Sequence, residues 1–266
     1  MTSMTAVRHR LILIPGQKKA GTTSLYEALA AACPDAFEVP KESGILAFQP
    51  ERLRRRLARN TSAATLIDAT TTYFRDGNFS DYVLRNITAF DQVHVLLMWR
   101  PEAQRLPSHY RHACNFDGWT RDFQSFLTSS DYHDHANLTA MHGALRGAGV
   151  TDIRIVPFAH LTDAAALQAL THDLFGTTFR ASTLAAAANS FGSRSVIPRP
   201  IEALVARPEF QVILRPLLPQ RLRHCVKWLL SRAPGPVEML DLDTPVVRET
   251  IAQLDAVNSA LAKETT

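Results

Sequence analysis

The stretch that decides the fold is residues 11–25, which read LILIPGQKKAGTTSL. Its first four residues are continuously apolar, as in a strand buried on both faces, and the run stops at the turn signal Pro15-Gly16. From Thr22 onward apolar residues recur at helical spacing, until Pro34 ends the pattern. The stretch therefore predicts a strand, a loop with a glycine at each end, and a helix.

Strands and helices continue to alternate up to residue 176. Short apolar runs predict further strands over 64–67, 93–99 and 153–157. Helical periodicity predicts helices over 52–58, 102–114 and 162–175, the last of them stopped by Gly176. Such alternation predicts an α/β fold in which helices flank both faces of a central parallel sheet.

The segment after Gly176 carries no further strand signal. It reads as a loop through Pro200, followed by helices over 201–206, 216–231 and 245–263. Neither an internal repeat nor a low-complexity linker divides the chain. We therefore expect a single domain over residues 1–266, with an α/β core at 10–176 and a loop and C-terminal helices at 177–266.

Composition narrows the classes of function. The 266 residues are 46% hydrophobic and 20% charged, and the cysteines, Cys33, Cys114 and Cys225, form neither a disulfide framework nor a metal pattern. No run approaches the roughly 20 apolar residues of a membrane span, so we expect a cytoplasmic protein without stable membrane insertion. A pI near 9.1 favours an anionic ligand. A nucleic-acid-binding module is disfavoured, because 29 basic residues are offset by 25 acidic ones.

Gly16 and Gly21 enclose the loop after the first strand, which is the usual phosphate site of a parallel sheet. Their flexibility exposes backbone N–H groups, and the next helix directs the positive end of its dipole to the same place. A nucleoside-triphosphate loop needs a lysine directly after the second glycine, but Thr22 stands there and Lys19 lies two residues before Gly21. The loop therefore predicts an anion site of another kind.

The loop and the start of the helix resemble the 5′-phosphosulfate loop of sulfotransferases that use 3′-phosphoadenosine 5′-phosphosulfate (PAPS), above all the heparan-sulfate-type and bacterial branch. The resemblance implies that these residues bind the donor: Gly16, Gln17, Lys18, Lys19, Ala20, Gly21, Thr22, Thr23 and Ser24. It also implies that Lys19 is catalytic and neutralises charge on the departing phosphate. The product is then 3′-phosphoadenosine 5′-phosphate (PAP).

A second motif of the resembled family binds the 3′-phosphate of the donor with a strand-end arginine and a later serine. Arg100 and Ser108 have the required spacing. An arginine pairs with a phosphate through two parallel hydrogen bonds, and a serine adds a hydroxyl donor. Ser193 and Arg194 resemble part of the late loop that closes over the nucleotide, which assigns this role to the start of 177–266.

The acceptor must lose a proton, which requires a base within hydrogen-bond reach. Residues 40–43 resemble the Lys-Glu segment of the family, and this resemblance makes Glu42 the first candidate. Asp68, at the end of a predicted strand, is the reserve. His109 and His112 titrate near neutrality, but on the helix after Arg100 we expect them to contact the nucleotide or the solvent.

The predicted activity is the transfer of a sulfonate group from PAPS to a hydroxyl or amine of a small-molecule, carbohydrate or lipid acceptor. Lysine and arginine would supply the charge that a metal supplies in a kinase, so no metal is expected. His133-Asp134-His135 is expected to form a solvated polar loop and not a metal cluster.

The leading alternative is a P-loop nucleotide kinase or NTPase that uses ATP and magnesium, with Asp68 holding the metal. The expected partner is a small-molecule or glycan acceptor and no nucleic acid, and formation of a homodimer stays open.

Overall fold

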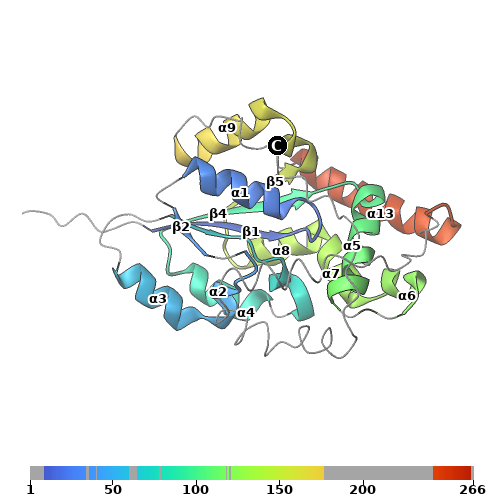
Figure 1. The fold of residues 1–266 in the computed structure, drawn as a ribbon, viewed down its shortest axis with the longest axis horizontal. Coiled ribbons are helices and arrows are strands. Elements are labelled where there is room, and N and C mark those ends of the chain that lie inside the picture. The colour runs from blue at the N-terminus through green and yellow to red at the C-terminus, as the bar shows by residue number, and fades with distance from the viewer. Residues whose placement is uncertain are drawn as a thin grey trace, which may run out of the picture.

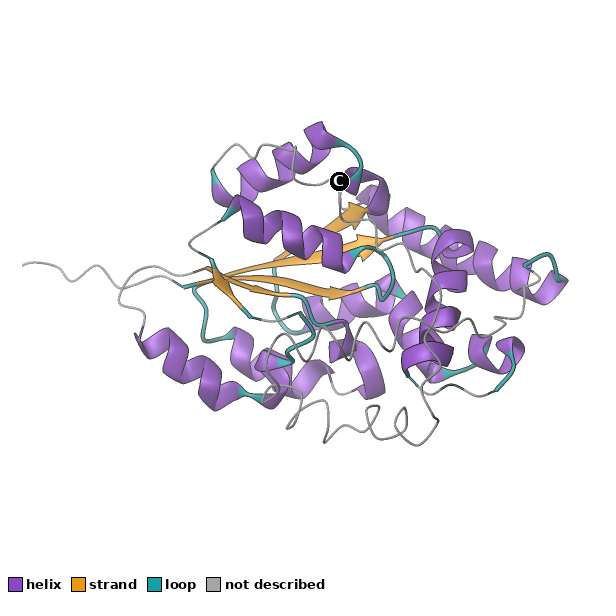
Figure 2. Ribbon diagram, in the orientation of Figure 1, coloured by secondary structure: helices purple, strands orange, loops and turns teal. Residues whose placement is uncertain are grey.

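The structure, a computed structural model, describes residues 9–33, 36–39, 41–59, 65–77, 79–117, 119, 121–176 and 242–264. Within these ranges the centre is a five-stranded sheet in the order β2-β3-β1-β4-β5, and each neighbouring pair of strands is parallel. The strands are β1 (Arg10–Gly16), β2 (Phe37–Glu38), β3 (Thr65–Asp68), β4 (Gln92–Trp99) and β5 (Asp152–Pro157). Helices cover both faces of the sheet, so the predicted α/β fold is confirmed (Figures 1 and 2).

The central strand β1 explains the continuous apolar run. Leu11 and Leu13 belong to one core and Ile12 and Ile14 to the other, and all four side chains are fully buried. Because successive side chains point to opposite faces, a strand covered on both sides is apolar throughout. Each of these side chains stabilises the fold by about 1.5–3 kcal/mol relative to an exposed position.

One face of the sheet is covered by α1 (Thr22–Ala32) and α9 (Ala164–Phe175), which lie together above the strands in Figure 1. They bury Leu25, Leu29 and Leu167 against the core that contains Ile12. The predicted ending of α9 is confirmed, because Gly176 follows it in the left-handed conformation, with φ 69°.

The opposite face is covered by α2 (Ile45–Phe48), α3 (Pro50–Arg59), α4 (Phe79–Ile87), the 3-10 helix η1 (Thr71–Gly77) and α8 (Leu138–Gly147). Figure 1 shows these helices below the strands. Leu46, Leu53, Val83 and Leu145 from this group pack in the core that contains Leu11. The two faces are thus separate hydrophobic cores on one sheet.

A third group of helices lies beyond the carboxyl ends of the strands, at the right of Figure 1. It comprises α5 (Glu102–Phe116), α6 (Phe123–Leu127), α7 (Ser130–Ala136) and α13 (Pro245–Glu264). They pack around Tyr110, Phe126 and Tyr132, with Val247 from α13. The short 3-10 helix η2 (Phe158–Leu161) follows β5 directly. This end of the sheet is where ligands bind in open parallel folds.

The structure corrects one expectation about local structure. His133-Asp134-His135 is not a loop but lies within α7, and His135 is fully buried. The side chain of Ser129 caps this helix by accepting a hydrogen bond from the backbone N–H of Tyr132. The cap and the burial of Tyr132 outweigh the polar composition.

The predicted helix over 245–263 is confirmed as α13, whereas the predicted helices over 201–206 and 216–231 lie outside the described residues. Of the helices that the structure describes, none is both long and apolar enough to cross a membrane.

Candidate active site

The glycine loop connects β1 to α1, and its last residue is the N-cap of α1. Gly21 has φ 98°, and among the described residues no side chain caps the helix. The helices α6, α7, α8 and α9 are capped by Asp122, Ser129, Asn137 and Asp163. An uncapped helix start of this kind, with its backbone N–H groups and the positive end of the helix dipole, is where proteins commonly bind an anion.

Gly21 cannot carry a side chain, for two reasons. Its positive φ is strained for other residues. A Cβ atom would also lie 2.6 Å from Cδ1 of Leu161 and 2.9 Å from Cδ2 of Phe158. The close approach of η2 to the loop therefore depends on this glycine.

Lys18 and Lys19 are neighbours with different surroundings. Lys18 is buried, and its Nζ forms an ion pair of 2.7 Å with Asp117, the residue after α5. Lys19 has a positive φ of 69°. Burial, followed by the charges of Lys41 and Lys18, lowers the pKa of Lys19 from 10.5 to about 8. The carboxylates of Asp117 and Glu42 oppose this shift in pKa.

Arg100 follows β4, the strand that pairs with β1. Its Nη1 donates to the carbonyl oxygen of Lys19 at 3.4 Å, and its guanidinium carbon lies 4.3 Å from the centre of the Phe158 ring. Within the described part of the chain its Nε is buried and has no hydrogen-bond partner. Burial, followed by the charge of Arg105, lowers the pKa of Arg100. An anion would satisfy the unused donors and offset these effects.

Ser108, the predicted companion of Arg100, is half-buried on α5. Its predicted contact with a 3′-phosphate stays a prediction. Ser193 and Arg194 lie outside the described residues.

Glu42 is held in place by the turn after β3. Its backbone N–H donates to the carbonyl oxygen of Ala69 at 2.9 Å. Its carboxylate accepts from both the backbone N–H and the hydroxyl of Thr71, each at 2.9 Å, and pairs with Lys41 at 2.7 Å. The side chain is 29% exposed. Its charge raises the pKa of Lys19 and so partly offsets the effect of burial there.

Asp68, the reserve base, is fully buried. One of its oxygens accepts from the hydroxyl of Tyr73 and the other from that of Thr70. Burial raises the pKa of Asp68 to about 6, and the two hydroxyls oppose this rise in pKa. Asp68 therefore anchors the turn that carries Thr71, and both of its oxygens are already used.

The two histidines of α5 do not behave as exposed bases. His109 is fully buried, and its Nδ1 lies 3.1 Å from Nη1 of Arg105. Burial and the charge of Arg105 hold the pKa of His109 well below its usual value. The expectation that His109 contacts solvent is therefore wrong.

His112 lies close to the lysines. Burial, followed by the charges of Lys19 and Lys18, lowers the pKa of His112 to about 2. It is a neutral neighbour of the loop at ordinary pH.

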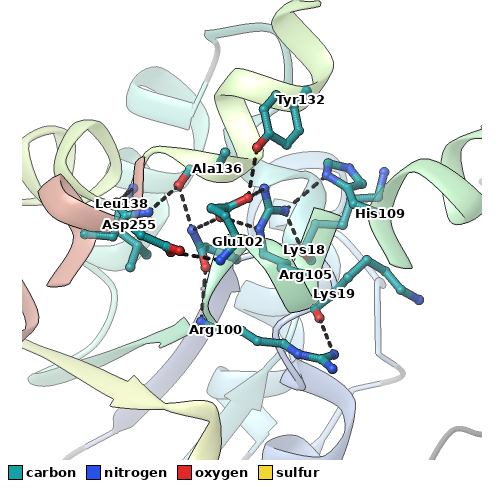
Figure 3. A network of polar contacts seen from close by, with 12 residues as sticks. Lys18, Lys19, Arg100, Glu102, Arg105, His109, Tyr132, Ala136, Leu138 and Asp255 are labelled. Atoms are coloured by element: carbon teal, nitrogen blue, oxygen red, sulfur yellow. Dashed lines mark hydrogen bonds and ion pairs between the residues drawn. The ribbon is translucent and has the colours of Figure 1, made fainter. Parts of the chain in front are cut away.

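A buried polar network supports the loop from behind (Figure 3). Arg105 donates from Nε and Nη2 to the two oxygens of Glu102, at 2.7 and 2.9 Å, and from Nη1 to the carbonyl oxygen of Lys18 at 3.0 Å. Tyr132 donates to Glu102 at 2.9 Å. Glu102, Arg105 and Tyr132 are all fully buried. Such a paired and hydrogen-bonded group fixes the position of the backbone that it contacts.

Gln17 belongs to this network and not to the open side of the loop. Its side chain is fully buried and donates to the carbonyl oxygen of Ala136 at 2.6 Å. The side-chain oxygen Oε1 of Gln17 accepts from the backbone N–H of Arg100 at 3.4 Å. The backbone N–H of Gln17 donates to the carbonyl oxygen of Met98. Gln17 therefore joins the loop to the end of β4.

Sequence reasoning missed the contribution of α13. Asp255 accepts from the backbone N–H of Glu102 at 2.8 Å and so caps α5. Asn258, which is fully buried, donates to the same Ala136 carbonyl that receives Gln17. Nothing in the local sequence marks these two residues, because their partners are more than a hundred positions away.

Comparisons with known proteins found only distant structural neighbours. No family model matches the chain, and no curated protein matches its sequence. One solved structure with a similar fold is a sulfotransferase from Alicyclobacillus acidocaldarius, with 17% identity and a TM-score of 0.47, which covers 76% of this chain and 94% of its own. Another is the sulfotransferase domain from the Synechococcus PCC 7002 olefin synthase, with 13% identity and a TM-score of 0.45, which covers 95% of each chain. Both are distant neighbours, from which nothing about donor or acceptor follows.

Proposed function

We propose that the chain is a sulfotransferase that moves a sulfonate group from PAPS to a hydroxyl or amine of a small-molecule, carbohydrate or lipid acceptor. One observation carries this proposal. The guanidinium of Arg100, with a buried and unused Nε, touches the backbone of Lys19 beside the uncapped start of α1. This proximity of two groups suited to anions supports a ligand that carries separate 5′- and 3′-anionic groups.

The loop would hold the 5′-phosphosulfate. The N–H groups at the start of α1 would bind its phosphate oxygens, and Lys19 would stabilise negative charge on the bridging oxygen as the S–O bond breaks. Lys18 is bound to Asp117, so we assign it to holding the loop. Because Lys19 and Arg100 supply positive charge, we propose that transfer needs no divalent metal.

Glu42 would act on the acceptor. A new bond forms between the acceptor oxygen or nitrogen and sulfur, the acceptor proton moves to the Glu42 carboxylate, and the electron pair of the broken bond stays on the 5′-phosphate of PAP. The two hydrogen bonds from Thr71 fix the orientation of this carboxylate. A base that is already oriented loses little freedom in the transition state.

The kinase alternative fits the site less well. Thr22 stands where the triphosphate loop has its lysine. Asp68 would have to hold magnesium, but it is fully buried and its oxygens accept from Tyr73 and Thr70.

A thermal-shift experiment tests the proposal directly. The melting temperature of the full chain is measured with PAP, ADP and ATP at equal concentration, each with and without magnesium. We expect PAP to raise the melting temperature most, because at equal concentration the ligand with the lowest Kd stabilises the folded protein most. A chelator should not reduce the shift caused by PAP, because the proposed site binds it without a metal. If ATP with magnesium gives the largest shift, the kinase alternative replaces the proposal.

A further inference from the structure

Phe158 touches both halves of the candidate site, although it is not a hydrogen-bonding residue. It is the first residue of η2, directly after β5, and is half-buried. One face of its ring lies 4.3 Å from the guanidinium carbon of Arg100. The ring edge formed by Cδ2 and Cε2 is the surface that a Cβ on Gly21 would meet, at 2.9 and 3.0 Å.

The ring is an important restraint on Arg100. A guanidinium over an aromatic face is attracted by the ring electrons, and the attraction is larger where water is excluded. The other contact of the guanidinium, to the carbonyl oxygen of Lys19, is long at 3.4 Å. Among the described residues its Nε has no partner that could fix the rotamer. Without the ring, the long side chain would have several orientations of similar energy.

We infer that Phe158 is a positioning residue that gives the site its selectivity for a nucleotide with a 3′-phosphate. By stacking on Arg100 it holds the guanidinium in the orientation that meets this phosphate. By packing against Gly21 it sets the separation between Arg100 and the 5′-anion site. This inference rests on the proposed function, because it assigns the 3′-phosphate to Arg100.

A residue that only fills space predicts a different result. If Phe158 merely packs η2 on the loop, its replacement weakens the binding of all nucleotides by the same factor. If it positions Arg100, the loss concerns ligands with a 3′-phosphate. The ratio of two affinities therefore separates positioning from packing.

The experiment measures by calorimetry the dissociation constants of PAP and of adenosine 5′-phosphate, which differ only in the 3′-phosphate. The test variant is Phe158→Leu, which keeps an apolar side chain but removes the ring. Phe158→Tyr keeps the ring face and serves as the conservative rescue. The matched control is Phe123→Leu, because Phe123 is also a half-buried aromatic residue but packs edge-to-face against Tyr110.

We expect Phe158→Leu to reduce the preference for PAP over adenosine 5′-phosphate by roughly five- to tenfold, the size of a partly desolvated cation–π contact. Phe158→Tyr and Phe123→Leu should leave the preference within about twofold, because neither changes the face on Arg100. In an Arg100→Gln background, Phe158→Leu should cause little additional loss of preference, since an uncharged side chain has no cation–π contact with the ring to lose.

The inference is overturned if Phe158→Leu leaves the preference for PAP unchanged. It is also overturned if Phe158→Leu reduces that preference as much in the Arg100→Gln background as in the unmodified protein. The affinities of the unmodified protein for the two nucleotides test the proposed function separately. If it shows no preference for PAP over adenosine 5′-phosphate, the assignment of Arg100 fails before the role of Phe158 is considered.

Discussion

The buried guanidinium of Arg105 donates to the carbonyl oxygen of Lys18 at 3.0 Å, and through this bond the protein interior fixes the loop that carries Lys19. Its other donors bind Glu102, and Glu102 in turn accepts from Tyr132. The loop is therefore positioned by residues that do not face its open side. A preorganised loop does not have to be ordered at the moment of binding.

Breaking this buried pair should destabilise the whole protein. Glu102→Gln leaves the charge of Arg105 buried opposite a neutral amide, so we expect the free energy of unfolding to fall by about 3–5 kcal/mol. Urea denaturation measures this loss. The control is Glu51→Gln, which breaks the exposed pair with Arg54 on α3 and should change little. Equal effects of the two variants would contradict the role of the network.

The two adjacent lysines should separate into one structural and one catalytic residue. Lys19→Ala should reduce sulfonate transfer by about 10²–10³-fold, because it removes the charge that stabilises the leaving group. It should cost no stability, since the depressed pKa of Lys19 means that folding disfavours its charged form. Lys18→Ala should lower stability more, because it removes the ammonium group that pairs with Asp117 at 2.7 Å. Turnover and thermal unfolding are measured for both variants. If Lys18→Ala loses activity and Lys19→Ala loses stability, Lys18 is the catalytic residue and Lys19 the structural one.

Binding of the donor should weaken at alkaline pH. In the free protein the pKa of Lys19 is about 8, so Lys19 is charged below this pH and neutral above it. We therefore expect the affinity for PAP to fall as the pH rises through about 8. Calorimetric titrations over neutral and alkaline pH measure this decrease in affinity. Lys19→Arg should shift this decrease in affinity to higher pH, because arginine stays protonated. If the affinity of Lys19→Arg falls over the same pH range as that of the unmodified protein, a group other than Lys19 causes the decrease.

Two glycines provide a matched test of the loop geometry. Gly21→Ala should greatly weaken nucleotide binding, since its Cβ would meet Leu161 at 2.6 Å and its φ is 98°. Gly143→Ala, on α8, meets nothing within 4 Å and should be neutral or stabilise by about 0.5–1 kcal/mol. Thermal unfolding and PAP titration of the two variants measure the contrast. Wild-type binding by Gly21→Ala would show that η2 and the loop need not approach closely.

The parts of the fold that could be predicted are those written in local sequence. The apolar run before Pro15 and the spacing after Thr22 are short-range signals, and β1, the loop and α1 follow them. The ordering of β4 and Arg100 beside the loop follows from parallel topology. Neither required knowledge of distant residues.

The parts that could not be predicted depend on contacts between distant positions. Asp255 and Asn258 look like ordinary polar residues of a surface helix, and only the packing of α13 against α5 and α7 shows their partners. Its place on the helix after Arg100 suggests that His109 contacts the nucleotide or the solvent, whereas it lies one helical turn after Arg105 and shares the buried site of that residue. The inward orientation of the Gln17 side chain likewise depends on a distant partner, the carbonyl oxygen of Ala136.

The most direct test of the central claim is a calorimetric titration of the metal-free protein with PAP, repeated for Lys19→Ala and Arg100→Lys. If the loop and Arg100 form a site for the two anionic ends of one nucleotide, the unmodified chain binds PAP at micromolar or lower concentration. Each variant then weakens binding at least tenfold while the fold is retained. Absence of PAP binding by the unmodified chain, or undiminished binding by both variants, would contradict the account.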